Sequence, residues 1–123
     1  VETPLAGAMR AMFIAETDAE AERRARSAYL RWYESLVWLW ELRGQKIPIP
    51  LSPDYDTARA AGTLVVGGPD TVRAELLEQA GIAGFDYLVL QLAFGSLTHD
   101  DEMRSLELFR TEVMPALAET PGA

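Results

Sequence analysis

The residues best suited to chemistry lie at the end of an apolar stretch, GFDYLVLQLAFG, at positions 84–95. Gln91 is the one polar residue inside the strand predicted there, and His99 begins the helix predicted to follow. In parallel α/β folds, catalytic groups often lie where strands end and helices begin, so Gln91 is a candidate ligand contact and His99 a candidate site residue. The alternatives are a hydrogen bond from Gln91 to a neighbouring residue and an exposed first-turn position for His99.

Other sites that the residue types allow are less well supported. The glycine pair 67–68 precedes a predicted helix, where free backbone amides could hold a phosphate. Neither the G-x-G-x-x-G nor the G-x-x-x-x-G-K-[ST] motif is present, so a plain helix cap is favoured. The acidic runs 54–56 and 100–102 lack the spacing of a calcium loop, so solvated acids are the favoured interpretation. His99 is the only histidine, and Ser96 has no neighbouring base. The sequence therefore predicts no metal site and no nucleophile.

The three tryptophans, Trp32, Trp38 and Trp40, could stack on a flat cofactor or anchor a partner helix. Aromatic residues at helical spacing are more often part of the core, which is the favoured interpretation. The run LVWLW at 36–40 is nevertheless apolar on nearly every side, so more than one side is expected to be covered. Trp38 and Trp40 are therefore predicted interface residues.

Composition limits the classes of function. The 123 residues fit one domain, and 49% hydrophobic with 24% charged residues is ordinary for a globular protein. A net charge of -8 argues against nucleic-acid binding, because little here would neutralise phosphates. Zero cysteines exclude disulfides and thiolate metal sites and fit a reducing, cytoplasmic compartment. No apolar run approaches the roughly 20 residues that cross a membrane, so no membrane partner is expected.

Helix caps and apolar spacing predict the elements that position these residues. A short buried strand is expected at 11–15, followed by a long helix that begins after Thr17 and ends at Gly44. A proline-rich connector is expected at 45–62, because its prolines exclude a regular helix. The buried face of the long helix is predicted to consist of Ala21, Ala25, Ala28, Trp32, Leu36 and Leu39.

The stretch 63–66 is either a strand or a buried lead-in to the next helix, which begins at Pro69 and ends at Gly81. Its predicted buried residues are Val72, Leu76 and Ala80. Two buried strands joined through helices form a right-handed parallel crossover. Two strands cannot cover their own edges and faces, so something else must complete them.

A last helix is predicted after the apolar stretch, with Thr98 as its cap and Pro115 as the residue that stops or kinks it. The tail at 118–123 is expected to fray. The apolar stripe of this helix is predicted to be Met103, Leu106, Phe109, Val113 and Leu117.

Four stretches, taken in order, resemble the C-terminal part of the luciferase-like, flavin-dependent monooxygenases. They are FIAETDAEAERRA, VVGGPDTVRAELL, GFDYLVLQLAFGSLTHDDEMRSLELF and EVMPAL. That family often has a strand running into an A-[ED]-T-D-x-E-A helix start, a G-[ST]-P-x-x-V helix start, a Gly-Phe-Asp strand and a helix ending in V-x-P-x-L. The match covers nearly the whole chain except the connector. Gly68 departs from it, because the family usually has Ser or Thr there.

The resemblance implies an α/β fold, the helix-rich C-terminal portion of a (β/α)8 TIM barrel, with the two predicted parallel strands as its last two. It also implies reduced FMN, or in some relatives a deazaflavin, and oxygenation or hydride transfer on small organic substrates. Gln91, Phe94, Gly95 and His99 would lie at the catalytic mouth of such a barrel. The family's flavin contacts come mostly from earlier strands and loops. This chain alone is therefore expected to bind no flavin and to be inactive.

The leading hypothesis is that residues 1–123 form a single segment of a longer flavin-dependent monooxygenase. The sequence does not begin with methionine, which allows this. Its expected partners are the rest of the barrel or a second copy of the chain, and a flavin reductase. The alternatives are a stand-alone, non-catalytic interaction module that dimerises or binds a partner chain, and a small acidic α/β domain unrelated to flavins.

Overall fold

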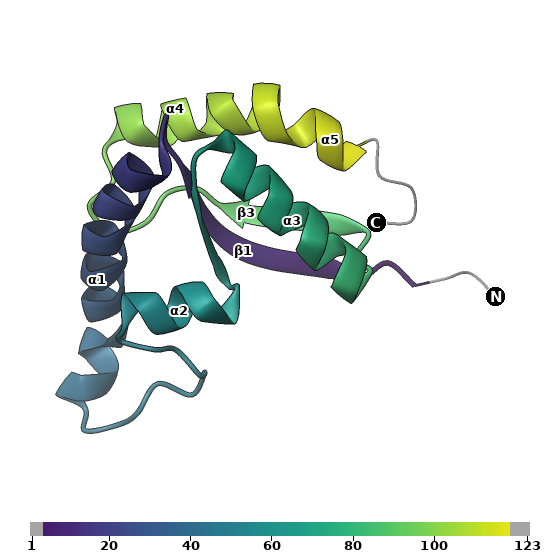
Figure 1. The fold of residues 1–123 in the computed structure, drawn as a ribbon. Helices are drawn as coiled ribbons and strands as arrows, with labels where there is room; N and C mark the ends of the chain where they lie inside the picture. Colours follow the sequence, from purple (N-terminus) through teal and green to yellow (C-terminus); the bar gives the residue numbers. More distant parts are fainter. Residues whose placement is uncertain (1–3, 119–123) are drawn as a thin grey trace.

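The computed structural model of the protein describes residues 4–118, which form a three-stranded sheet with helices packed on both faces (Figure 1). In chain order the elements are β1 Gly7–Ile14, α1 Asp18–Leu42, α2 Tyr55–Ala61, β2 Leu64–Gly67, α3 Pro69–Ala83, β3 Tyr87–Gln91, α4 His99–Leu108, η1 Phe109–Val113 and α5 Met114–Ala118. The predicted frayed tail lies, apart from its first residue, outside the described residues. Among the helices described, none is long and apolar enough to span a membrane.

β1 is the central strand of a parallel sheet whose order is β2-β1-β3. Its C-terminal half pairs with β2, with Ile14 opposite Gly67, and its N-terminal half pairs with β3, with Gly7 opposite Tyr87. The prediction of two parallel strands is wrong, because the stretch before α3 forms a third strand that is buried throughout. Four apolar residues before a helix cannot be identified as a strand by periodicity alone, since a buried lead-in has the same pattern.

The sheet separates two hydrophobic clusters. On one face, Phe13 and Val66 pack against α1 and α2. On the other face, Met12, Ile14 and Val65 pack against α3 and against the helix that runs from α4 into η1. The C-terminal half of β1 and the whole of β2 are therefore covered on both sides, as expected of strands in a parallel sheet.

α1 begins where the sequence predicts and packs on the sheet through alanine. The Thr17 hydroxyl accepts a hydrogen bond from the Glu20 amide at 3.2 Å, as an N-cap residue does. The first three positions of the predicted buried face are correct, because Ala21, Ala25 and Ala28 are fully buried. Their small side chains let the helix axis lie close to β1 and β2.

The second half of α1 departs from the predicted face. Leu36 and Leu39 are 37% and 55% exposed, whereas Val37 is buried. The reason is that the connector, rather than the sheet, covers this half of the helix, and it packs on the side that carries Val37 and Trp40. Within the described residues, the apolar run 36–40 is therefore covered on one side only.

The connector was predicted over residues 45–62. It is irregular over residues 45–54, and the helix α2 occupies most of the rest. The Tyr29 hydroxyl of α1 donates a hydrogen bond to the carbonyl of Ser52, which holds the connector against α1. The Asp54 carboxylate then caps α2 by accepting a hydrogen bond from the Thr57 amide at 3.0 Å.

α3 buries the predicted residues but ends three positions later than predicted. Gly81 lies inside the helix, and Gly84 ends it with a φ of +65° while donating its amide to the carbonyl of Ala80 at 2.9 Å. A left-handed residue at this position favours glycine, so the second of two nearby glycines decides where the helix stops.

The α4 helix is capped as predicted but turned relative to its predicted stripe. Thr98 and Asp101 form a reciprocal capping box. Met103 and Leu106 are 51% and 41% exposed, whereas Ser105 is fully buried, because its hydroxyl accepts the hydrogen bond of the Ile14 amide at 2.9 Å. Ser105, which binds the backbone of β1, is therefore buried where apolar periodicity predicted Met103 and Leu106.

Pro115 neither stops nor sharply breaks this helix. The five residues of η1, just before it, form a π-helical turn in which the Met114 amide donates to the Phe109 carbonyl. The wider turn accommodates a residue that has no amide hydrogen and whose ring would collide with the preceding carbonyls. The Arg73 guanidinium of α3 donates a hydrogen bond to the Glu112 carbonyl of η1 at 2.9 Å.

Candidate functional site

The three helices α1, α3 and α4 begin at the edge of the sheet where the strands end, which is where parallel α/β proteins place their ligand sites. A cavity of about 240 Å³ lies at this edge. Its lining residues come from the end of β1, the first turns of α1 and the start of α4, namely Phe13, Ile14, Ala15, Glu16, Glu20, Arg24, Asp101 and Arg104. We define this set as the mouth cavity.

Both arginines of the mouth cavity are neutralised by carboxylates. Arg24 pairs with Glu20 at 2.7 Å and with Asp101 of the α4 capping box. Arg104 pairs with Glu16 at 2.6 Å. Because each guanidinium already has a carboxylate partner, the cavity presents little free positive charge to an anionic ligand.

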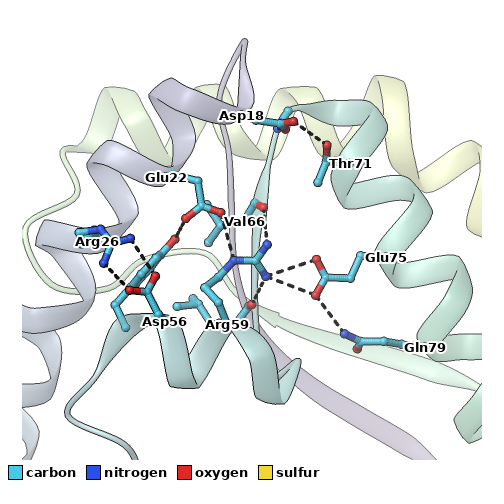
Figure 2. A network of polar contacts seen from close by, with 12 residues as sticks. Asp18, Glu22, Arg26, Asp56, Arg59, Val66, Thr71, Glu75 and Gln79 are labelled. Carbon is cyan, nitrogen blue, oxygen red and sulfur yellow. Dashed lines mark hydrogen bonds and ion pairs between the residues drawn. The ribbon is translucent and has the colours of Figure 1, made fainter.

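The glycine pair before α3 is already occupied by an anion from the same chain. The Asp18 carboxylate accepts a hydrogen bond from the Gly68 amide at 2.7 Å and another from the Thr71 hydroxyl at 2.9 Å (Figure 2). The amide of Gly68, and secondarily the Thr71 hydroxyl, hold the pKa of Asp18 below its ordinary value. A Cβ on Gly67 would lie 2.8 Å from Thr71, so this turn requires glycine for space. The helix-cap interpretation of these glycines is confirmed.

The phosphate of FMN finds no matching cradle in the part of the chain that the structure describes. At the starts of α1 and α4, side-chain hydroxyls already accept an amide of the first turn, and at the start of α3 Asp18 accepts the amide of the N-cap residue Gly68. The first turns also carry acidic side chains that would repel a phosphate, namely Asp18, Glu20, Asp70, Asp100, Asp101 and Glu102. Residues 4–118 therefore do not fit the phosphate of a flavin nucleotide.

The predicted site residues fall into two groups. Gln91 ends β3 and is half-buried, and His99 is an exposed first-turn residue of α4; neither side chain forms a hydrogen bond within residues 4–118. Phe94 is 5% exposed and belongs to the core cluster under α1. Gly95 has a φ of +58°, and a Cβ there would lie 1.8 Å from the Ala28 carbonyl. Phe94 and Gly95 thus hold the loop after β3 against α1, which accounts for both residue types.

The predicted interface tryptophans face different surroundings. Trp40 is half-buried beside the connector, next to Ile47 and Leu51. Trp38 is 58% exposed on the other side of α1.

An apolar strip remains uncovered on the face of the sheet that carries Phe13. Met9 of β1 lies opposite Val89 of β3, and the two are 63% and 48% exposed. Tyr87, 51% exposed, packs its ring over Gly7, where a Cβ would lie only 2.2 Å from the ring. Gln91 continues the same face toward the mouth, since side chains alternate along a strand.

Sequence reasoning missed the group that covers the outer edge of β2. Thr63 and Gly67 carbonyls accept hydrogen bonds from β1, so the carbonyls of Leu64 and Val66 point away from it. The half-buried guanidinium of Arg59 in α2 donates to both of them, at 2.7 and 3.1 Å (Figure 2).

Carboxylates from two further helices hold Arg59 in place. Glu22 of α1 and Glu75 of α3 each lie 3.3 Å from it, and Glu22 also accepts the hydroxyl hydrogen of buried Tyr55 (Figure 2). Burial, followed by the hydrogen bond to Glu22, raises the pKa of Tyr55 well above its ordinary range. Residues so far apart in sequence carry no pattern that would have revealed this network.

The outer edge of β3 has no comparable partner. Within residues 4–118, the backbone of Tyr87–Gln91 forms hydrogen bonds only with β1 and with Ala6 just before it, whose carbonyl accepts the Tyr87 amide at 3.4 Å. One edge of the sheet is therefore closed by Arg59 and the other is open, next to the uncovered apolar strip.

No family model matches the sequence. The chain is 31% identical over 108 residues to the uncharacterized protein y4wF of Sinorhizobium fredii, a match that covers 88% of this chain and 32% of y4wF. The fold is similar to that of the monooxygenase RslO1 from Streptomyces bottropensis, with a TM-score of 0.72, 25% identity, and coverage of 90% of this chain and 30% of RslO1.

A second solved structure shares the fold at lower identity. It is the oxygenating constituent of 3,6-diketocamphane monooxygenase from Pseudomonas putida, a type II Baeyer-Villiger monooxygenase in complex with FMN. The TM-score is 0.65 at 22% identity, over 89% of this chain and 33% of that protein. The three parallel strands and their helices thus match part of a monooxygenase fold, and the chain spans about a third of the length of these relatives. A stand-alone interaction module is not favoured by these similarities.

Proposed function

We propose that this chain is the C-terminal portion of the (β/α)8 barrel of a luciferase-like, flavin-dependent monooxygenase. The observation that carries the proposal is the asymmetry of the sheet. Arg59 covers the short strand β2, which pairs only with Ala11–Ile14 of β1, so the first half of β1 stays unpaired by β2, and the β3 edge and the strip of Met9, Tyr87 and Val89 are open where further strands would continue a barrel. A fold match over 90% of this chain but 30% of RslO1 supports the same reading.

In this proposal β1 and β3 are the last two strands of the barrel, and α4 to α5 form its closing helix. The complete protein takes reduced FMN, supplied by a flavin reductase, and uses dioxygen to oxygenate a small organic substrate in the cytoplasm. A deazaflavin is the alternative cofactor. The flavin phosphate would be held by elements beyond this chain, because the helix starts described above do not fit it. The chain alone is therefore proposed to be inactive.

Gln91 and His99 are proposed to lie near the substrate or cofactor. Both are polar; Gln91 continues the face of the uncovered strip, His99 begins α4, and neither side chain forms a hydrogen bond within residues 4–118. Phe94 and Gly95 would hold the loop that connects them.

The first test is made on the natural polypeptide that carries this sequence. Its intact mass should correspond to a chain about three times as long, since the matched relatives are that much longer. The protein should bind FMN in a fluorescence titration, and oxygen uptake should depend on reduced FMN and on the protein. A natural product of only 123 residues, or one that leaves the reoxidation of reduced FMN unchanged, would refute the proposal.

The second test addresses the two site residues. His99→Ala and Gln91→Ala should each lower kcat/KM for the oxygenated substrate by about tenfold or more. Asp100→Asn, in the same exposed turn, and Gln45→Ala, in the connector, are the matched controls. Equal effects of the site and control variants would show that the site lies elsewhere in the protein.

A further inference from the structure

We propose that the outward face of the second half of α1 is the contact surface for a second copy of this chain. This proposal does not depend on the flavin chemistry, because it uses only the shape and charge of α1. In Figure 1 this half of the helix, at the lower left, extends past α2.

The outward face is a stripe at helical spacing. Arg31, Ser35, Trp38 and Leu42 follow one another at intervals of four, three and four residues, so they lie along one line of the helix. Trp38 and Leu42 are 58% and 67% exposed and lie one helical turn apart, so together they form an exposed apolar patch. The connector covers the other side of α1 and does not reach this stripe.

The stripe is self-complementary in shape. A hollow of about 400 Å³ beside Trp38 is lined by Arg31, Glu34, Ser35 and Trp38 itself. The small side chain of Ser35 leaves it open. When two α1 helices pack antiparallel about a two-fold axis midway between Ser35 and Trp38, each indole lies opposite Ser35 of the other copy and enters its hollow. Such isologous contacts are the commonest in homodimers.

The stripe is also self-complementary in charge. The same antiparallel arrangement places Arg31 of one copy opposite Leu42 of the other and therefore beside its Glu41. Within residues 4–118, Arg31, Glu34 and Glu41 form no ion pair, whereas every arginine in the first half of α1 does. The two-fold axis thus produces two Arg31–Glu41 pairs from charges that form no ion pair within residues 4–118.

The decisive experiment is sedimentation equilibrium of the full natural chain and its charge-reversal variants. The wild type should be a dimer, and Trp38→Ala should raise the dimer dissociation constant at least about tenfold. Arg31→Glu and Glu41→Arg should each weaken the dimer, and the double variant should restore it. Arg110→Glu, an exposed arginine of η1 without an ion pair in the described chain, is the control and should have no effect.

Three results would overturn the proposal. The first is a monomeric wild type. The second is a dimer that survives Trp38→Ala and both single reversals. The third is a double variant as weak as the single variants, because the two charges would then not pair across the contact.

Discussion

The two edges of the sheet differ in how their backbone groups are satisfied. At the β2 edge, Arg59 binds the two outward carbonyls and is itself held by Glu22 and Glu75. At the β3 edge, no group of residues 4–118 takes that role, and Val89 beside it is half exposed. Exposed strand edges are templates for further strands, so the difference indicates where a larger sheet would continue. Within residues 4–118, the β2 edge is covered and the β3 edge is free to pair with a further strand.

Replacing Arg59, which covers the β2 edge, should have the largest effect on the free energy of unfolding. Arg59→Met leaves Glu22 and Glu75 facing each other without their cation and two carbonyls without a donor, which we expect to cost about 3 kcal/mol. Chemical denaturation of the protein measures this. Arg110→Met is the matched control and should change the unfolding free energy by less than about 0.5 kcal/mol. Similar losses in the two variants would mean that the β2 edge is not held by Arg59.

Ser105→Ala should cost somewhat less. It leaves the Ile14 amide, at the end of the central strand, without an acceptor in a fully buried place, for a loss of about 2 kcal/mol. The exposed Ser96→Ala is the control in the same thermal unfolding experiment. An unchanged Tm in Ser105→Ala would show that the Ile14 amide finds another partner.

Asp18→Asn should change the pH dependence of stability at the junction of β2 and α3. The pKa of Asp18 is lowered in the folded protein, first by the Gly68 amide, so its carboxylate stabilises the fold above the unfolded pKa of about 4 and loses this effect as the pH falls through the lower, folded value. The Tm of wild type should therefore exceed that of Asp18→Asn at pH 7, and the difference should shrink below about pH 4.

Glu34→Gln, whose side chain forms no hydrogen bond in the described part of the chain, is the control for this pH series. A Tm difference between wild type and Asp18→Asn that stays constant from pH 7 to pH 2 would exclude the Asp18 carboxylate as the source.

The smallest effect is expected on the open side of the sheet. Val89→Thr in β3 should change the unfolding free energy of the 123-residue chain by less than about 0.5 kcal/mol, because Val89 is 48% exposed. Val65→Thr in β2 makes the same change in a fully buried side chain and should cost about 2 kcal/mol. Equal losses at the two positions would mean that β3 is as well covered as β2.

The sequence allowed the starts of helices to be predicted better than the sheet. The caps at Thr17 and Thr98 were predictable because each involves residues three positions apart. The order of the strands was not, because β2 has only four residues and its edge partner, Arg59, acts through tertiary contacts. The buried place of Ser105 was missed for the same reason, since its partner is 91 residues away.

The candidate site was predictable only in part. Gln91 and His99 could be chosen because a strand end followed by a helix start is visible in the sequence. The packing roles of Phe94 and Gly95 depend on the approach of Ala28, a long-range contact that periodicity does not encode. The hydrogen bond from the Gly68 amide to the Asp18 carboxylate likewise joins residues fifty positions apart.

Hydrogen exchange of the amides of β3 in the natural polypeptide shows whether the open edge is paired with further strands. If further strands pair with the open edge, consecutive amides from Tyr87 to Gln91 should all be protected, whereas β2 should show alternating protection, because Arg59 occupies carbonyls and not amides there. Alternating protection in β3, with every second amide exchanging rapidly, would show that its outer edge is free in the complete protein and that the sheet does not continue there.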